Sequence, residues 1–513
     1  MKRFRLTKAA KVLIMVLVLS LIGGGVFFGL KSGFIKSDKL SDLTDDNGNV
    51  INTEKETDDT INLSLDEWIG WKSIIDCNGG LSTTEGSIYD QLGIKVNISI
   101  INDATQSSNA LISGNLDAAG YTINRTAFLS QKFKEAGVDV VMPFITNFSN
   151  GGDGIIANSD ITTVKDLVNA KVGVPQFSEA HSLVVWFVNQ SDLSQNEKDT
   201  IIDNLIFFET PDEAAKAFFA GQIDVAATWE PYLTQAKNMS DAHVLFSTAS
   251  SSSLIMDGIL FNAEFAEENE EVVSKFIKGA LMASDMYDKE MNTIKKVMPM
   301  FATASNEDIK INCDAARLTT YGDNIKLFSS TAKTIYNDMC DVWESIGETV
   351  DRDLVKTLYN RKYIDNLASD FDTNEVTKLN NAVITEENEE QITNAVALLK
   401  KSTTVNFVAN TAKFLDSSEA TEKLDEFIEI ANVLDGSIIQ IEGNIASDND
   451  SEDGVALSKQ RADTVKQYFI LNGISADRII TVGNGGKCPV VPNDSEENMQ
   501  LNRRTDISFK CVE

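Results

Sequence analysis

Residues 110–119 read ALISGNLDAA and residues 217–226 read AFFAGQIDVA, so the chain carries one pattern twice. Each copy has apolar residues at helical spacing, then a Gly, an amide, an apolar residue, an Asp and small apolar residues. This order predicts a helix that ends at a Gly with positive φ and leads into a short buried strand. One copy would be ordinary in any α/β protein. Two copies that match at Ala, Gly and Asp predict two similar α/β lobes.

A polar or aromatic cluster follows each predicted strand. Residues 120–122 (GYT) follow the first strand, and residues 228–231 (TWEP) follow the second. In open α/β sheets the carboxyl ends of the strands point into the ligand crevice. We therefore expect two lobes that face one cleft and close around a small molecule by a hinge motion.

The composition is that of a globular, strongly acidic protein with more than one domain. The chain has 513 residues, of which 42% are hydrophobic and 24% are charged. This length predicts roughly two to four domains. The formal net charge of −32 argues against nucleic acid or anionic lipid as the main partner of the folded part.

Cysteine and histidine usage offers no support for a metal centre. The five cysteines form no Cys-x-x-Cys motif and no Cys/His cluster. His181 and His243 are the two histidines, so a His-based zinc site and a Ser-His-Asp triad are poorly supported. We predict no metal site, no cofactor and no catalytic residue. Cys488 and Cys511 either form a disulfide or remain two thiols, and the sequence leaves both open.

The N-terminus has the pattern of a membrane anchor. Residues 1–11 carry five basic residues and no acid, and residues 12–30 form an uncharged apolar run. That run is long enough to cross a bilayer, and no clear cleavage site follows it. We predict an uncleaved transmembrane helix at 12–30, with 1–11 in the cytoplasm and the rest exported, as a single-pass protein of the cell membrane. A cleaved signal peptide is the alternative. Residues 31–61 are polar and acidic and predict a linker.

Two loops in the central region have the composition of ligand-binding loops. Residues 147–154 (NFSNGGDG) contain three glycines, so their backbone N–H groups can approach a small ligand closely. A crossover turn between lobes explains the same residues. Residues 176–182 (QFSEAHS) precede an apolar helix, whose N-terminus would present free N–H groups to an anion.

With these features, roughly residues 62–370 resemble the periplasmic-type solute-binding proteins of ABC importers, in the branch for nitrate, taurine, aliphatic sulfonates and thiamine precursors. The resemblance is carried by residues 66–71 (DEWIGW), 110–119, 149–155 (SNGGDGI), 159–174 and 221–231, which ends in Trp-Glu-Pro. It implies a two-lobe periplasmic-binding-protein fold of type II. It also implies the ligand contacts, namely Trp71, Tyr121, Ser149, Asn150, Asp153, Ser178, Glu179, His181, Trp229, Glu230 and Asp257.

Each of these residues also has an interpretation without a ligand. Trp229 suits an ordinary core, Glu230 suits a cap on the following turn, and Asp153 suits the closure of a Gly-rich turn. If Asp153 and Glu230 both face the cleft, a cationic or amine-bearing ligand is favoured over a bare sulfonate or nitrate. The reason is that burying two carboxylates beside an anion is costly.

The C-terminal part predicts a separate module. Residues 371–399 are polar and acidic, with a helical pattern over 389–399, and predict a linker. Residues 400–513 then alternate strand and helix patterns, beginning with a strand over 403–407. This module resembles the α+β peptidoglycan-binding domain of OmpA through residues 405–407 (VNF), 457–462 (LSKQRA), 477–479 (DRI), 483–489 and 502–504 (NRR).

The resemblance implies a peptidoglycan site that is only partly present. In that family an Asp at a strand end and an Arg in the Leu-Ser-x-x-Arg-Ala motif hold the diaminopimelate stem. Here Ala446 occupies the Asp position, whereas Arg461 and Arg504 remain. Asp448 or Asp450, in the acidic loop 447–453 that follows, is the substitute carboxylate. Binding to another wall polymer, or to none, stays open.

These observations predict an exported, membrane-anchored receptor that is not an enzyme. It would capture a small polar molecule and deliver it to an ABC permease, while its C-terminal domain associates with peptidoglycan. One alternative is an envelope tether or sensor with no transport role. Another is an enzyme on the same two-lobe scaffold, which the scarcity of histidine makes the least favoured.

Overall fold

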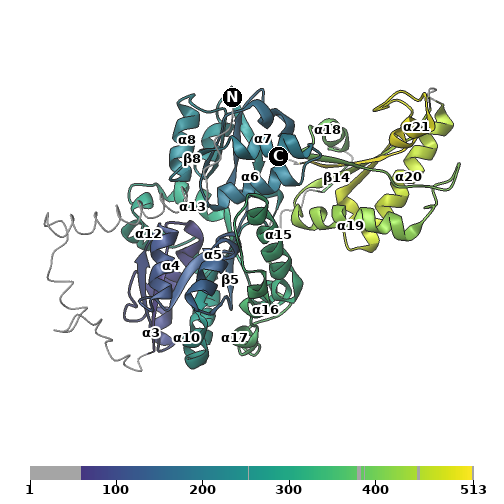
Figure 1. The fold of residues 1–513 in the computed structure, drawn as a ribbon. Coiled ribbons are helices and arrows are strands. Elements are labelled where there is room, and N and C mark those ends of the chain that lie inside the picture. The colour runs from purple at the N-terminus through teal and green to yellow at the C-terminus, as the bar shows by residue number, and fades with distance from the viewer. Residues whose placement is uncertain (1–58, 252, 378–382, 386–387, 448–450, 511–513) are drawn as a thin grey trace. The chain divides into compact units, whose positions relative to one another are not determined.

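The computed structural model describes residues 59–251, 253–377, 383–385, 388–447 and 451–510. They form three β-sheets with helices around them (Figure 1). The predicted membrane segment at 12–30 lies outside these residues. Within the described ranges, no helix has both the length and the apolar character needed to cross a membrane.

The first sheet has the strand order β12-β5-β11-β3-β1-β2, with β4 paired to β11. Its strands are β1 (Thr60–Leu65), β2 (Lys95–Ile100), β3 (Ala118–Thr122), β4 (Val140–Val141), β5 (Ile145–Ser149), β11 (Met256–Asn262) and β12 (Ala316–Leu318). Strand β1 runs parallel to β2 and β3, whereas β11 runs antiparallel to β3 and β5. Its helices include α2 (Lys72–Asn78), α3 (Ile88–Gln91), α4 (Ala104–Ile112), α5 (Ile123–Ala136), α10 (Ala263–Glu268) and α11 (Glu270–Met282).

The second sheet has the order β10-β6-β9-β7-β8. Its strands are β6 (Asp153–Asn158), β7 (Val172–Pro175), β8 (Ile206–Phe208), β9 (Val225–Trp229) and β10 (Ala242–Ser247). Its helices are α6 (Glu179–Asn189), α7 (Gln195–Asp203), α8 (Pro211–Phe219) and α9 (Tyr232–Lys237). Strand β7 is parallel to β8 and β9, and β6 is antiparallel to β9 and β10. Each of the two sheets thus combines a parallel part with an antiparallel part.

The chain passes between the two sheets twice, from β5 to β6 and from β10 to β11. The two crossings are joined by hydrogen bonds. Ser149 Oγ lies 2.8 Å from Thr248 Oγ1, and the Gly151 N–H donates to Thr248 Oγ1 at 2.9 Å. Two short, adjacent connections are what a hinged pair of lobes requires. The predicted two-lobe α/β architecture is confirmed.

The repeated sequence pattern occupies equivalent places in the two lobes. In the first lobe, Gly114 follows α4 with φ +73° and leads to β3; in the second, Gly221 follows α8 with φ +68° and leads to β9. Asp117 accepts a hydrogen bond from the Asn62 N–H at 2.9 Å. Its counterpart Asp224 accepts one from the Lys171 N–H at 2.8 Å. Each Asp therefore secures the start of the parallel strand next to its own.

Helices after β11 complete the binding module. They are α12 (Asn292–Val297), α13 (Asn306–Asp314), α14 (Tyr321–Lys326), α15 (Ala332–Ser345), α16 (Val355–Leu358) and α17 (Lys362–Asp365). Helix α15 packs against α5 of the first lobe and α6 of the second. Trp343 on α15 is buried, and its Nε1–H donates to the Asn124 carbonyl oxygen at 2.9 Å. This helix therefore contacts both lobes at once.

The C-terminal sheet has the order β13-β16-β14-β15. Its strands are β13 (Leu399–Thr403), β14 (Ile438–Asn444), β15 (Ile479–Gly485) and β16 (Thr505–Lys510), with helices α18 (Glu389–Asn394), α19 (Ser417–Val433), α20 (Glu452–Leu471) and α21 (Glu496–Asn502). The first strand is β13 and not residues 403–407, because Leu399 pairs with Phe509 in the sheet and is buried. The helix predicted to extend to residue 399 ends at Asn394 for the same reason.

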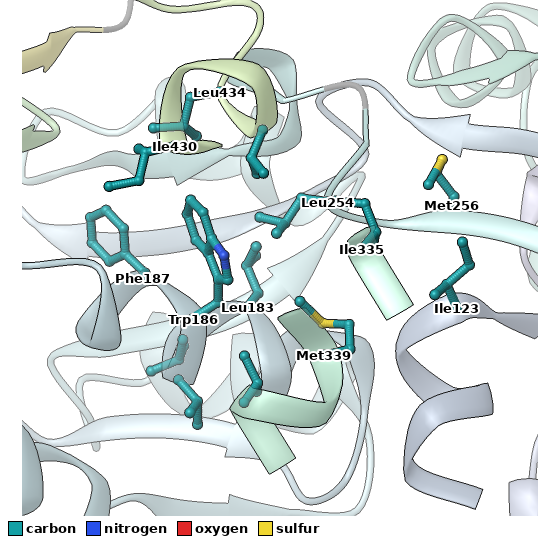
Figure 2. Packing of buried hydrophobic residues seen from close by; sticks show 14 of the residues in the cluster. Ile123, Leu183, Trp186, Phe187, Leu254, Met256, Ile335, Met339, Ile430 and Leu434 are labelled. Atoms are coloured by element: carbon teal, nitrogen blue, oxygen red, sulfur yellow. The ribbon is translucent and has the colours of Figure 1, made fainter. Parts of the chain in front are cut away.

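The C-terminal module packs against the second lobe through apolar side chains. Figure 2 shows Ile430 and Leu434, at the end of α19, facing Trp186 and Phe187 of α6 within one buried cluster. A backbone hydrogen bond from the Gly436 N–H to the Ser250 carbonyl oxygen, 3.1 Å long, accompanies this packing. Residues from Asp59 onward accordingly form one compact unit.

Three of the cysteines are buried and unpaired. Cys77, Cys313 and Cys340 pack as small apolar side chains, as expected for cysteines outside any motif. Cys488 is exposed and free, and Cys511 lies outside the described residues.

Candidate ligand-binding cavity

A cavity of about 30 Å³ lies where the carboxyl ends of strands from both sheets meet. It is lined by Asp66, Trp68, Trp71, Tyr121, Thr122, Asp153, Glu179, Trp229, Ile255 and Asp257. The first lobe contributes the end of β3 and the start of β11. The second lobe contributes the start of β6, the end of β9 and the start of α6. Both lobes therefore supply walls of the same cavity.

Three of the aromatic walls, Trp68, Trp71 and Tyr121, are held in place by their polar edges. Trp71 Nε1 donates to Asp66 Oδ1 at 2.6 Å, and Trp68 Nε1 donates to Asn147 Oδ1 at 3.0 Å. Tyr121 Oη lies 2.5 Å from Ser107 Oγ. Because these polar atoms are engaged by the protein, the rings offer mainly apolar surface to the cavity.

Gly120 permits the close approach of the Trp71 ring to β3. A Cβ atom at this position would lie 2.9 Å from Trp71 Cζ2 and 2.8 Å from Leu65 Cδ2. Any larger residue there would displace the indole, which explains why the polar and aromatic cluster after the first repeat begins with Gly.

Four carboxylates line the cavity, and the guanidinium of Arg125 pairs with two of them. Arg125, in the first turn of α5, lies with Nη2 2.7 Å from Glu179 Oε2 and with Nη1 3.6 Å from Asp66 Oδ2. Glu179 also accepts a hydrogen bond from Thr122 Oγ1 at 2.8 Å. Since Arg125 belongs to the first lobe and Glu179 to the second, this ion pair joins the two lobes across the cavity.

The other two carboxylates form no ion pair within the described residues. Asp153 and Asp257 are 7% and 3% exposed, and Asp257 Oδ2 is buried with no hydrogen-bond partner. Burial raises the pKa of Asp153 to about 7, a contact with Ser149 lowers it, and Glu179 and Asp66 raise it further. Burial, followed by repulsion from Asp66 and Asp153, also raises the pKa of Asp257 well above its usual range.

The raised pKa of Asp153 predicts a pH-dependent stability difference between the unliganded protein and Asp153→Asn. A folded state with a pKa of about 7 holds more protons than the unfolded state between the ordinary value of 3.8 and that pH. The stability that protonated Asp153 contributes is therefore lost as the pH rises from about 4 to about 7. The variant should match the parent near pH 4 and unfold a few degrees higher near pH 8. A difference in thermal midpoint between parent and variant that stays constant from pH 4 to pH 8 would contradict the raised pKa of Asp153.

Six of the eleven residues predicted to contact a ligand lie on this cavity. They are Trp71, Tyr121, Asp153, Glu179, Trp229 and Asp257. Two others support its walls without lining it. Ser149 Oγ forms a hydrogen bond with Thr248 Oγ1 and accepts another from the Asp153 N–H at 3.1 Å. Asn150 donates its backbone N–H to the Ala315 carbonyl oxygen at 2.8 Å.

The remaining three predicted residues serve local structure. Ser178 caps α6 by accepting from the His181 N–H at 3.2 Å. His181 is buried edge-on to Trp343, and burial lowers its pKa to about 4. Glu230 accepts hydrogen bonds from the Thr234 hydroxyl and N–H, at 2.9 and 3.1 Å, so it caps α9 as the alternative interpretation holds.

Four lining residues were not predicted, namely Asp66, Trp68, Thr122 and Ile255. Asp66 and Trp68 belong to the same stretch as Trp71, directly after the buried strand β1. This position at a strand end could have indicated that they line the cavity. Arg125 was also missed, since nothing in the pattern of α5 distinguishes it from a surface residue.

In the C-terminal domain, the two predicted arginines are engaged internally. Arg461 lies 4.9 Å from the centre of the Phe407 ring, and its Nε donates to the Thr411 carbonyl oxygen at 3.1 Å. Arg504 forms two hydrogen bonds with Asp506, at 2.9 and 3.0 Å. Ala446 follows the end of β14 and is half-buried. Asp448 lies outside the described residues.

Comparisons with known families divide the chain in the same way. Residues 84–287 match the family model described as NMT1/THI5 like, and residues 406–503 match that of the OmpA family.

Curated relatives match the C-terminal part. Outer membrane protein A of Bordetella avium is 33% identical over 108 residues, which is 20% of this chain and 56% of the relative. Peptidoglycan-associated lipoprotein of Pasteurella multocida is 29% identical over 97 residues, or 19% of this chain and 65% of the relative. The chain thus spans 56% and 65% of the lengths of these two relatives.

Solved structures align with the two-lobe part. The periplasmic aliphatic sulphonate binding protein SsuA of Escherichia coli aligns with a TM-score of 0.45 and 16% identity, covering 59% of this chain and 98% of that one. The periplasmic nitrate-binding protein NrtA of Synechocystis PCC 6803 aligns with a TM-score of 0.38 and 13% identity, covering 59% and 92%.

Proposed function

We propose that this chain, which carries an NMT1/THI5-like domain followed by a C-terminal OmpA domain, is the extracytoplasmic solute-binding component of an ABC importer. The two lobes capture a small polar molecule and present it to a membrane permease. Residues 12–30 anchor the protein in the cell membrane, and the OmpA domain associates it with peptidoglycan. No catalytic step is part of this function.

The observation that carries the proposal is a cavity whose walls come from both lobes. Asp66, Tyr121 and Asp257 belong to the first sheet or its loops, whereas Asp153 and Trp229 belong to the second sheet. A ligand that contacts both sets of residues stabilises the closed arrangement over the open one, which is how binding drives a hinge. The paired crossings at Ser149 and Thr248 are where this hinge lies.

Wall association rests on the C-terminal relatives, which include a peptidoglycan-associated lipoprotein. Arg461 is the residue we assign to the wall polymer, because its side chain sits partly exposed beside Phe407. A guanidinium suits the carboxylate of a peptide stem. Arg504 instead holds Asp506 and acts on wall binding through the structure of the sheet.

A thermal-shift screen of the purified chain tests the receptor function. The screen covers nitrate, sulfonates, ureas, guanidines, amines and pyrimidines. A ligand at 100 times its dissociation constant stabilises the folded state by about 2.7 kcal/mol, which raises the midpoint by several degrees. A single chemical class that raises the midpoint supports the receptor. A flat result on folded protein favours an envelope tether with no transport role.

A further inference from the structure

The charge balance of the cavity is strongly acidic. Four carboxylates line it, those of Asp66, Asp153, Glu179 and Asp257, and none of its lining residues is basic. Arg125 pairs with Glu179 and Asp66, so its positive charge is already engaged. Asp153 and Asp257 therefore remain as two buried carboxyl groups without a cationic partner among the described residues.

Unsatisfied polar atoms mark where a ligand would bind. Asp257 Oδ2 is a buried acceptor with no donor, and Trp229 Nε1 is a buried donor with no acceptor. A buried polar atom without a partner costs about 1–3 kcal/mol, so both atoms indicate a missing group. A bound molecule with N–H donors near Asp257 would satisfy the first atom, and an acceptor atom near Trp229 would satisfy the second.

The aromatic walls point to an organic cation and not to a metal ion. Trp68, Trp71 and Tyr121 use their polar edges within the protein and present ring surface to the cavity. Ring faces attract ammonium and guanidinium groups, whereas a metal ion needs oxygen or nitrogen ligands around it. Among the residues that the structure describes, no group of three or more His, Cys, Asp or Glu side chains is placed to hold a metal.

The size of the cavity limits the group that enters it. A cavity needs a volume of about 10–15 Å³ to hold one water molecule. The volume of about 30 Å³ found here therefore accommodates a group of a few non-hydrogen atoms. A primary ammonium, an amidinium or a guanidinium group meets this limit.

We propose that the cavity binds a compact organic cation, with Asp153 and Asp257 as its carboxylate partners and the aromatic rings as its walls. The proposal rests on the receptor function above and names the chemical class of its ligand. Among the described residues, the charged or titratable groups that interact with the two carboxylates are Asp66, Glu179, Arg125 and Tyr287, and Tyr121 lines the same cavity. Binding requires an ionised Asp153, whose pKa is about 7, so affinity increases between pH 5 and pH 8 as that carboxyl group releases its proton.

The experiment compares cations with neutral molecules of the same shape. The purified full chain is titrated at constant ionic strength with guanidinium against urea, and with acetamidinium against acetamide, each up to 10 mM. Nitrate and methanesulfonate serve as anions. Tryptophan fluorescence and the thermal midpoint are both recorded, because three tryptophans line the cavity. We expect a response to the cations alone.

Variants separate the charge assignment from a general loss of structure. Asp257→Asn should weaken cation binding roughly 10- to 100-fold, since it removes a charged acceptor. Asp160→Asn, an exposed Asp in the same lobe as Asp153, should bind like the parent. Folding of each variant is checked by its unliganded midpoint.

The outcomes distinguish this proposal from the receptor function. A response to urea, acetamide or an anion but not to the cations overturns the charge assignment and leaves the receptor intact. Equal cation binding by Asp257→Asn and the parent also overturns it. No response to any of the six compounds, on folded protein, overturns the organic-cation proposal, and a flat wider screen overturns the receptor function as well.

Discussion

Replacing Asp506 with alanine is expected to destabilise the C-terminal domain by about 3–5 kcal/mol, because the change removes a buried carboxylate and leaves the Arg504 side chain, which is 10% exposed, without its partner. Asp506 is 1% exposed and accepts two hydrogen bonds from Arg504. It also accepts one from Asn444 at 3.1 Å and one from Ser402 at 2.6 Å. The carboxylate thus links three adjacent strands, β13, β14 and β16.

Hydrogen exchange of peptides from β14 and β16 measures this effect. A loss of 3 kcal/mol corresponds to roughly hundredfold faster exchange where exchange follows unfolding of the domain. Glu496→Ala is the matched control, because the Arg503–Glu496 ion pair lies on the surface of the same domain. Its exchange should equal that of the parent. Equal exchange rates in both variants would show that Asp506 has no special role.

Replacing Arg125 with methionine is expected to lower the free energy of unfolding of the binding module by about 2–3 kcal/mol. The change leaves Glu179 and Asp66 unpaired beside two further carboxyl groups, in a cavity with little solvent to screen them. The estimate lies below that for Asp506 because the side chains left unpaired are more exposed, Glu179 at 15% and Asp66 at 25%, than Arg504 at 10%. The loss should be smaller at low pH, where the carboxylates are protonated.

Urea unfolding followed by tryptophan fluorescence measures the Arg125 effect. All five tryptophans belong to the binding module, so this signal is specific to it. Lys134→Met is the control, since Lys134 lies on the same helix and pairs with Asp351 while 53% exposed. Its midpoint should stay close to that of the parent. An Arg125 variant no less stable than the Lys134 variant would mean that the ion pair across the cavity contributes little.

The two lobes could be predicted because their signals are local. A helix that ends at a positive-φ Gly, followed by a short apolar strand, depends on backbone geometry and on the burial of neighbouring residues. The sequence repeats this combination at Gly114 and Gly221, and the structure has it at both places. The C-terminal strands and helices follow from the same kind of pattern. The start of β13 was missed, because only pairing with β16 decides which apolar residue enters the sheet.

The sequence by itself determined two α/β lobes, a C-terminal OmpA-like domain and a set of residues near the strand ends. Only the tertiary structure decided which of those residues meet. Strand-end position does not specify side-chain direction, so Glu230 could cap α9 while Asp153 faces the cavity. Arg125 and Asp66 are 59 positions apart and Arg125 and Glu179 are 54 apart, so their pairing depends on two lobes folding against each other. Contacts of that range have no local signature, which is why the acidic, aromatic cavity emerges only from the folded chain.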